Sequence, residues 1–278
     1  MVQIAVVPAA GRGSRLWPVT RVIAKEMLPL GYQPVLQYVL EELAAAGICH
    51  LHLILAPSKR HIRDYFMASG APRLNSPNGP VSLTFGYQKE PLGTADAVRL
   101  ARKVTGSSPF IVAYGDCVIL EKKWGALIKK MIDVYESERP AAVLAVEHVP
   151  KQAVSRYGIV APLSRRKDLF PIKGIVEKPS PQEAPSRLAL AARFLFSPLI
   201  YQALTTVEKR NGEFQLTDAV QWLVEQGHKV LCVRLDGAIR IDVGHFSGYY
   251  EGLFHWIRLQ GGLTAIPKSL IRALRRLS

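Results

Sequence analysis

The sequence predicts an α/β fold built on a mostly parallel sheet, and three observations support this prediction. Short apolar runs typical of buried strands alternate with segments of helical periodicity through the first half of the chain. Such alternation is typical of βαβ units, in which a helix joins two parallel strands. Hydrophobic residues make up 49% of the 278 residues, which is enough for the core of one large domain, alone or with a small appendage.

The elements of the first half are predicted from these patterns. Strands are expected at residues 4–7, 50–56, 81–87, 110–113 and 141–146, and helices at residues 35–46, 59–68, 94–103 and 122–138. Residues 69–80 are rich in turn formers and are interpreted as a loop on the surface. Because ligands of parallel sheets bind at the carboxyl ends of the strands, we expect one crevice beside the ends of the first and fourth strands.

After Pro150 the pattern changes to shorter pieces typical of hairpins. Strands are expected at residues 157–160, 172–176, 188–196 and 229–235, and a helix is expected to begin near Thr217 with an apolar stripe at Val220, Leu223 and Val224. Residues 267–278 place leucine and isoleucine on one face of a helix and lysine and arginine on the other. We expect this basic amphipathic helix to pack on the domain or on a second subunit, with contact to anionic lipid as the alternative.

The chain is strongly basic, with 36 lysines and arginines against 22 aspartates and glutamates, a formal net charge of +14. Such an excess favours anionic partners: nucleotides, nucleic acid or a membrane surface. Basic and aromatic residues do not alternate as a base-stacking platform requires, so no specific nucleic-acid partner is expected. No window is apolar enough to span a bilayer, so no stable membrane insertion is expected either.

The location is predicted from the N-terminus and the cysteines. The first residues form the opening strand and contain neither a basic region nor a cleavable apolar region, so no signal peptide is expected. Cys49, Cys117 and Cys232 are an odd number and show no C-x-x-C spacing. These features favour reduced thiols and a cytoplasmic protein.

A glycine-rich loop with two cations follows the first strand, in the stretch VVPAAGRGSRLWPVTRVIAKEMLPLGYQP at residues 6–34. Gly11 and Gly13 allow backbone amides to approach an anion closely, and Arg15 and Lys25 follow with Glu26 as the one nearby acidic residue. The loop is neither a P-loop nor a dinucleotide fingerprint. It predicts a phosphate site, and the alternative is a tight turn with two surface cations.

Two further strand ends carry polar residues that suit a nucleotide. Gly93 and Thr94 begin a helix whose N-terminus faces the expected ligand, and the amide of Gln88 suits a pyrimidine edge. Asp116 ends an apolar strand, where a carboxylate beside phosphates favours Mg²⁺. Cys117 is interpreted as a small buried residue rather than a ligand or a nucleophile.

These stretches resemble the signature of the sugar-1-phosphate nucleotidylyltransferases. The resemblance rests on G-x-G-S-R-L-x-P, K-E-M-L-P and Q-P within residues 11–34, on G-I-V-E-K-P at 174–179 and on G-E-F-Q-L-T-D-A at 212–219. The K-E-M-L-P and G-E-F-Q-L-T-D-A motifs look most like the bacterial UDP-glucose pyrophosphorylase branch, the UTP-glucose-1-phosphate uridylyltransferases. This implies a Rossmann-like three-layer α/β/α nucleotidyltransferase fold with a mixed, mostly parallel central sheet. It also implies an enzyme that transfers a uridylyl group from UTP to glucose 1-phosphate, giving UDP-glucose and pyrophosphate.

The resemblance implies roles for the residues that match its motifs. Nucleotide binding is implied for Ala9, Ala10, Gly11, Gly13, Ser14, Arg15, Lys25, Gln88, Gly93 and Thr94. Sugar-phosphate binding is implied for Gly115, Tyr157, Gly158, Glu177 and Lys178. Catalytic roles are implied for Arg15, Lys25, Lys178 and Asp116, and a Mg²⁺ cofactor is implied on Asp116 and Asp242. The G-E-F-Q-L-T-D-A stretch is interpreted as scaffold behind the sugar pocket.

The same resemblance implies one nucleotidyltransferase domain over residues 1–266, followed by the basic helix at 267–278. Its nucleotide-binding half is expected at about 1–150 and its sugar-phosphate-binding half at about 151–266. The expected partners are a nucleoside triphosphate, a sugar 1-phosphate and further copies of the chain in a homo-oligomer. Because the attacking sugar phosphate is already an anion, no general base is expected, and catalysis is expected from alignment and fixed cations.

Departures from the family pattern leave alternatives open. The G-T-A-D-A-V form at residues 93–98 resembles the ADP-glucose and mannose-1-phosphate enzymes as much as it resembles the uridylyl branch. Therefore dTTP, ATP or CTP remains an alternative to UTP. Other departures favour a noncatalytic nucleotide-sugar-binding relative, and a nucleic-acid or membrane module is supported by net charge alone. The residues that favour this noncatalytic alternative are Arg21, Ala24, Tyr32 and Gln33. His245, Phe246 and Ser247 also depart from the pattern, in the loop after Gly244.

Overall fold

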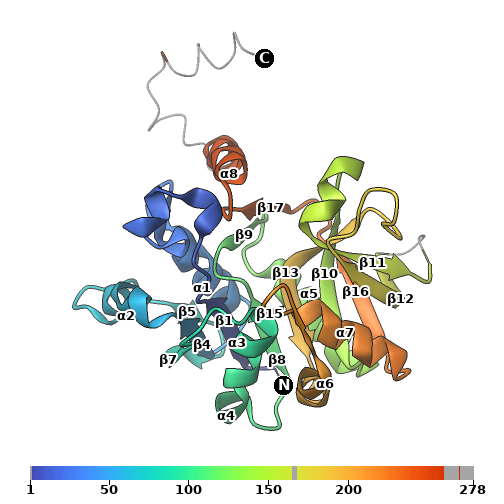
Figure 1. The fold of residues 1–278 in the computed structure, drawn as a ribbon. Coiled ribbons are helices and arrows are strands. Elements are labelled where there is room, and N and C mark those ends of the chain that lie inside the picture. The colour runs from blue at the N-terminus through green and yellow to red at the C-terminus, as the bar shows by residue number, and fades with distance from the viewer. Residues whose placement is uncertain (1, 165–167, 260–268, 270–278) are drawn as a thin grey trace.

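A nine-stranded mixed sheet runs through the molecule in the order β10-β16-β12-β11-β13-β8-β1-β4-β7 (Figure 1). The computed structural model describes residues 2–164, 168–259 and 269. The strands are β1 (Ile4–Ala9), β4 (His50–Leu55), β7 (Ser82–Tyr87), β8 (Phe110–Ala113), β10 (Ala142–His148), β11 (Gly158–Pro162), β12 (Leu169–Glu177), β13 (Leu188–Phe196) and β16 (Val230–Arg234). The pairings make β12 and β13 antiparallel to all the other strands, so the sheet is mixed and mostly parallel, as expected.

Strand β13 joins the two halves of the sheet. Its C-terminal residues pair with β8 of the first half, with Arg193 opposite Ala113 and Phe196 opposite Phe110. Its other edge pairs with β10 of the second half. In Figure 1, β1, β4 and β7 lie on the left and β10, β11, β12 and β16 lie on the right.

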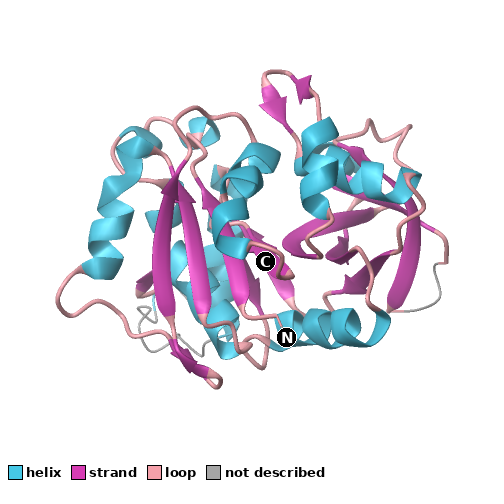
Figure 2. Ribbon diagram, turned by 90° about the horizontal axis from the view of Figure 1, so that it is seen from below, coloured by secondary structure: helices cyan, strands magenta, loops and turns pink. Residues whose placement is uncertain are grey.

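Helices cover both faces of the sheet, as Figure 2 shows for both halves of the molecule. They are α1 (Val35–Ala45), α2 (Arg60–Met67), α3 (Thr94–Leu100), α4 (Arg102–Thr105), α5 (Ala126–Glu138), α6 (Ile200–Thr206), α7 (Leu216–Glu225) and α8 (Phe246–Leu259). The alternation of side chains along β1 sends Ala5 and Val7 into one core and Val6 into the other. Helices α1, α2 and α5 supply the first core, and α3, α6 and α7 supply the second. The three-layer α/β/α prediction is therefore confirmed.

Most predicted elements lie within a few residues of the observed ones, and three differences matter for the site. The helix expected at 94–103 is divided into α3 and α4, and α5 starts only after Gly125, whose φ of 79° breaks the predicted first turn. Sequence reasoning missed α6, α8 and the antiparallel pair β9 (Cys117–Leu120) and β17 (Ile239–Asp242). The basic helix predicted at 267–278 lies outside the described residues, apart from Ser269.

A fully buried ion pair ties these layers together beneath the site. The guanidinium of Arg193 on β13 donates through Nε and Nη2 to both carboxylate oxygens of Glu42 on α1, at 3.0 and 2.6 Å. Nη2 also donates to the carbonyl of Cys117, at the start of β9, at 2.9 Å. Both side chains are completely buried. This pair fixes α1 and β9 to the central strand.

Candidate active site

A cavity of about 770 Å³ opens where β1 and β8 end, and both halves of the sheet contribute to its wall. The predicted residues that line it are Ala10, Gly11, Gly13, Ser14, Arg15, Lys25, Gln88, Gly93, Thr94, Asp116, Tyr157, Gly158, Glu177, Lys178 and Asp242. Ala9 and Gly115 are not in this wall. They pack on each other beneath it, since a Cβ added to Gly115 would lie 3.2 Å from the Cβ of Ala9. The structure thus brings together the cations and carboxylates that lie far apart in the chain.

The glycine loop is shaped by its contacts with Thr20 and Lys25. Gly13 has a φ of 69°, in the left-handed region, and its carbonyl accepts a hydrogen bond from Thr20 Oγ1 at 2.8 Å. A Cβ at Gly11 would lie 3.4 Å from Lys25 Nζ. The loop therefore wraps closely over the lysine, and a side chain at residue 11 would press on the ammonium group.

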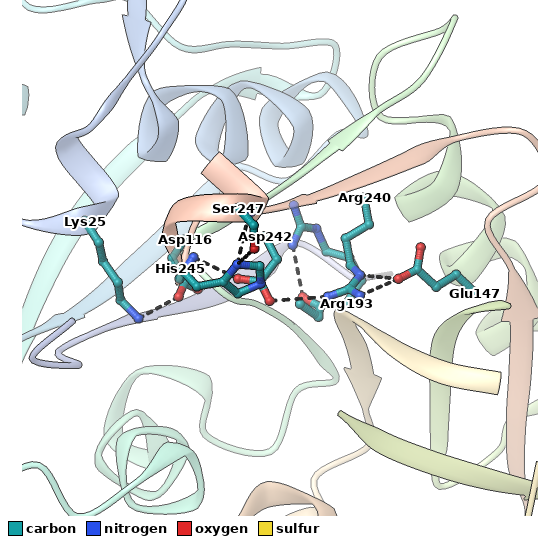
Figure 3. Close-up of polar contacts among 11 residues, drawn as sticks. Lys25, Asp116, Glu147, Arg193, Arg240, Asp242, His245 and Ser247 are labelled. Atoms are coloured by element: carbon teal, nitrogen blue, oxygen red, sulfur yellow. Dashed lines mark hydrogen bonds and ion pairs between the residues drawn. The ribbon is translucent and has the colours of Figure 1, made fainter. Parts of the chain in front are cut away.

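Lys25 is paired with Asp116, not with its sequence neighbour Glu26. Its Nζ lies 2.6 Å from Asp116 Oδ2, and both side chains are largely buried (Figure 3). Burial alone would lower the pKa of Lys25, but Asp116 and Glu26 outweigh it and raise that pKa. Burial would raise the pKa of Asp116, but Lys25 outweighs it and holds that pKa below its usual value. Both groups are therefore charged across the physiological range.

Glu26 is held by Lys59, a residue that sequence reasoning placed in a helix and gave no role. Lys59 Nζ donates to Glu26 Oε2 at 2.7 Å and to the carbonyl of Ala9 at 2.8 Å, and both side chains are buried. This contact ties the turn that carries Lys25 to the end of β1. Nothing in the local sequence pattern distinguishes Lys59 from a surface lysine, because its partners lie in other segments.

The pairing of β9 with β17 places Asp242 beside Asp116. Asp242 lies opposite Cys117 in the register, and the Val243 N–H donates to the Asp116 carbonyl at 3.1 Å. A Cβ added to Gly244 would lie 2.9 Å from Asp242 Oδ1, 3.0 Å from Arg15 Nη2 and 3.5 Å from Asp116 Oδ2. Two carboxylates and one guanidinium therefore converge around Gly244.

This donor set suits Mg²⁺. Within the described part of the chain, no group of three or more histidine, cysteine, aspartate or glutamate side chains is placed to hold a metal. Mg²⁺ is commonly bound by one or two carboxylates, with water and phosphate oxygens completing its octahedron. Asp116 and Asp242 provide two such carboxylates on one side of the cavity.

Gln88 lies at one corner of the cavity, and both N–H groups of its side-chain amide already donate hydrogen bonds within the protein. The buried side-chain Nε2 of Gln88 donates to the Gly93 carbonyl at 3.0 Å and to Asp96 Oδ2 at 2.8 Å. Because both N–H bonds of the amide are used, its carbonyl oxygen is left to accept from a ligand. Asp96, in the G-T-A-D-A-V stretch, thus fixes the orientation of Gln88, a role that sequence reasoning did not give it.

Gly93 fits this corner because no side chain is possible there. Its φ is 94°, and an added Cβ would lie 2.5 Å from the Phe214 carbonyl. Phe214 N–H donates to the Leu92 carbonyl at 2.8 Å, and Leu216 N–H donates to Thr94 Oγ1 at 3.2 Å. The stretch at 212–219, interpreted as scaffold, therefore braces the start of α3 and also lines the cavity itself.

The opposite end of the cavity carries a glutamate and a lysine on adjacent residues. Glu177 lies opposite Gly158 in the β11–β12 ladder, and its Oε2 accepts from Thr217 Oγ1 at 3.0 Å. Lys178 Nζ lies 3.2 Å from Glu177 Oε1, and its backbone has a φ of 45°, which non-glycine residues rarely adopt. Its N–H donates to the Tyr157 carbonyl at 3.0 Å, so the unusual turn is held by the residue that precedes β11.

Arg240 connects this end to the carboxylate pair and was missed as a functional candidate. Its guanidinium carbon lies 4.1 Å from the ring centre of Tyr157. Its Nε donates to Glu147 at 2.5 Å, and its Nη1 is 3.7 Å from Asp242 Oδ2 (Figure 3). Burial would lower the pKa of Arg240, but the surrounding carboxylates and the Tyr157 and Cys117 groups raise it. Arg240 therefore stays charged and holds Tyr157 in place.

Cys117 is buried, as predicted, and we expect it to be unreactive. Burial raises its pKa to about 12, so at pH 8 only about one molecule in 10,000 carries the reactive thiolate. Iodoacetamide at pH 8 is expected to leave Cys117 of the folded protein unmodified by mass spectrometry, and to modify it in denaturant. Rapid labelling of native Cys117 with loss of activity would show that the thiol is exposed or needed.

The comparisons with known proteins agree with this geometry. A family model described as "Nucleotidyl transferase" matches residues 4–255. A UTP–glucose-1-phosphate uridylyltransferase 2 of Streptococcus pyogenes serotype M1 is 38% identical over 267 residues, 90% of this chain and 88% of the relative. The UTP–glucose-1-phosphate uridylyltransferase of Bacillus subtilis strain 168 is 34% identical over 263 residues, 89% of this chain and 88% of the relative.

Solved structures are similar over nearly the whole chain. A UDP-glucose pyrophosphorylase complexed with UDP-glucose superimposes with a TM-score of 0.84 at 27% identity, covering 93% of this chain and 99% of that one. The UDP-glucose pyrophosphorylase from Acinetobacter baumannii gives a TM-score of 0.86 at 29% identity, covering 99% and 100%. Among the described residues, no helix has the length and apolar character needed to cross a membrane.

Proposed function

The chain belongs to the nucleotidyl transferase family, and on that basis we propose that it transfers the uridylyl group of UTP to glucose 1-phosphate, giving UDP-glucose and pyrophosphate. The observation that carries this assignment is the single cavity lined by Arg15, Lys25 and Lys178. The acceptor oxygen of Gln88 suits the uracil N–H at one end, and Glu177 suits sugar hydroxyls at the other.

The reaction is a displacement at phosphorus. A phosphate oxygen of glucose 1-phosphate forms a bond to the α-phosphorus of UTP, and the bond from that phosphorus to the bridging oxygen breaks. Pyrophosphate leaves with the electron pair. The attacking oxygen is already anionic, so no side chain has to remove a proton. The protein has to align two anions that repel each other and stabilise the charge of the leaving group.

Arg15 and Lys25 are proposed to bind the triphosphate, and Lys178 the phosphate of the sugar. The Lys25–Asp116 contact at 2.6 Å holds the ammonium charged and aimed into the cavity before a ligand enters. Such preorganisation matters because cations that need not reorient stabilise the transition state more effectively. Mg²⁺ held by Asp116 and Asp242 would supply further positive charge to the phosphate oxygens.

Removing one proposed metal ligand is expected to raise the Mg²⁺ requirement. For Asp242→Asn, the concentration of Mg²⁺ that gives half-maximal activity should rise about tenfold or more, since the neutral amide is a weaker ligand. The measurement is an activity titration with Mg²⁺. The matched control is Asp236→Asn, an exposed aspartate outside the cavity, which should leave the titration unchanged. An unaltered titration of Asp242→Asn would remove this residue from the metal site.

The function is tested by pyrophosphate release with UTP, dTTP, ATP and CTP, each against a panel of sugar 1-phosphates. We expect UTP with glucose 1-phosphate to have the highest kcat/KM. A higher kcat/KM with another triphosphate would show that the enzyme prefers a base other than uracil. A chain that binds UDP-glucose but releases no pyrophosphate with any pair would be the noncatalytic relative that the departures at Arg21, Ala24 and the Tyr32–Gln33 pair favoured.

We also propose a cytoplasmic homo-oligomer. The buried free thiols of Cys49, Cys117 and Cys232 support a reducing compartment. The exposed aromatic side chains of Tyr32, Tyr250 and Phe254, on and beside α8, support contacts between copies. Light scattering of the purified chain tests the second point, and a monomer at micromolar concentration would contradict it.

A further inference from the structure

A second cavity, of about 410 Å³, lies in the second half of the molecule and takes no part in the proposed reaction. Four basic side chains line it: His148, Lys151, Arg187 and Arg234. Among the described residues, no aspartate or glutamate is part of its wall. The remaining wall consists of proline, alanine, serine, valine and leucine, so the cavity has cationic groups on an otherwise weakly polar surface.

Strand pairing explains why these cations meet. His148 is the last residue of β10 and lies opposite Leu188, the first residue of β13. Arg187 precedes Leu188 and so lies just beyond the β10–β13 ladder. Its carbonyl accepts a hydrogen bond from Val149 N–H at 2.9 Å. On the other edge of β10, Arg234 at the end of β16 pairs with Val146. The two arginines therefore flank the end of β10 from opposite sides, and the positions are fixed by backbone pairing rather than by flexible loops.

The basic side chains of this cavity repel one another. Burial lowers the pKa of His148, and the neighbouring Arg187 and Arg234 lower it further, so both guanidinium groups lie close enough to repel a proton on the imidazole. The guanidinium carbon of Arg234 lies 5.3 Å from the ring centre of Phe170, on the adjacent strand β12. A wall with several basic side chains and no carboxylate favours an anionic ligand.

We propose that this second cavity binds a small molecule carrying more than one phosphate group. Its volume is within the range of small-molecule sites, and it is too small for a nucleic-acid duplex. Arginine presents a planar fork that matches phosphate oxygens, and lysine supplies a point charge. Several phosphates are needed to engage Lys151, Arg187 and Arg234 together. This site goes beyond the proposed uridylyl transfer.

The second cavity shares two walls with the first. The 3₁₀ segment Lys151–Arg156 carries Lys151 into the second cavity and Arg156 into the first. The connection from β12 to β13 begins with Lys178 in the first cavity and ends with Arg187 in the second. An anion in the second cavity would therefore hold the two segments that form the sugar end of the first.

Isothermal titration with tripolyphosphate tests the proposal, in EDTA and with UDP-glucose present to fill the first cavity. The wild-type chain should bind one tripolyphosphate per chain. The double variant Lys151→Gln/Arg187→Gln should bind about 100-fold more weakly, since each lost charged hydrogen bond is worth on the order of tenfold. The control Arg63→Gln/Lys103→Gln removes the same charges from exposed positions outside both cavities and should bind like wild type.

Both double variants should keep wild-type turnover with UTP and glucose 1-phosphate, which shows that they are folded. Equal binding by the two double variants would overturn the proposal, as would a wild-type chain with no saturable binding. Orthophosphate should bind far more weakly than tripolyphosphate. If the wild type binds phosphatidylglycerol vesicles through Lys151 and Arg187 but not tripolyphosphate, the cluster recognises a membrane and the small-molecule proposal is wrong. The comparison of variants reports on the second cavity even if UDP-glucose is not the ligand of the first.

Discussion

Replacing Lys25 by methionine is expected to lower kcat with UTP and glucose 1-phosphate by about 100- to 1,000-fold, which corresponds to roughly 2.7–4 kcal/mol of transition-state stabilisation. Lys25 is largely enclosed by the site, beneath Gly11 and against Asp116. Methionine keeps the length of the side chain and removes its charge. The charge of Asp116 is then left without its partner, which also disfavours binding of a triphosphate.

Steady-state kinetics of pyrophosphate release measures this effect, and circular dichroism shows that the variant is folded. The control is Lys89→Met, one residue after Gln88, because Lys89 is exposed and not part of the cavity wall. Its kcat should stay within about twofold of wild type, as is typical of surface positions. A Lys25→Met variant that turns over like wild type would show that this lysine does not stabilise the leaving group.

Replacing Glu42 by glutamine is expected to lower the free energy of unfolding by about 3 kcal/mol or more. Burial would lower the pKa of Arg193, but Glu42 outweighs it and raises that pKa, so the guanidinium stays charged when its partner is lost. An unpaired buried charge is one of the most destabilising features that a single substitution can create. The loss also loosens α1 and β9, which position the cavity from below.

Urea denaturation gives this change in free energy. Glu138→Gln is a suitable control, because it breaks the solvent-exposed ion pair of Glu138 with Lys229. That change should cost no more than about 1 kcal/mol, as is typical of surface pairs. A Glu42→Gln variant that is as stable as Glu138→Gln would mean that Arg193 finds another partner, and that the pair does not hold the layers together.

The predicted residues that line the cavity could be found in the sequence because most of them lie in short local motifs. Gly11, Gly13 and Arg15 belong to one loop, and Glu177 and Lys178 to one strand end. Such motifs follow from local backbone requirements, for example the positive φ of Gly13 and Gly93. The alternation of strands and helices likewise predicted an α/β fold with a mostly parallel sheet. The three-layer arrangement was implied by the family resemblance.

The partners within the site could not be predicted, because they depend on contacts between distant segments. Glu26 is the one acidic residue near Lys25 in the sequence, whereas the structure pairs Lys25 with Asp116, 91 residues away. The Arg193–Glu42 pair spans 151 residues. The β9–β17 pair was missed because the local pattern of a short strand does not show which distant segment lies beside it. Without this pair, the strand pattern alone did not place Asp116 beside Asp242, and only the family resemblance related the two residues.

A crystal structure of the chain with UDP-glucose and Mg²⁺ tests most directly whether both reactants meet in this cavity. We predict that the diphosphate lies in the cavity between Lys25 and Lys178, within hydrogen-bonding distance of at least Lys178. The uracil should lie at Gln88 and the metal on Asp116 and Asp242. A diphosphate that contacts neither lysine, or a nucleotide sugar bound outside this cavity, would contradict it.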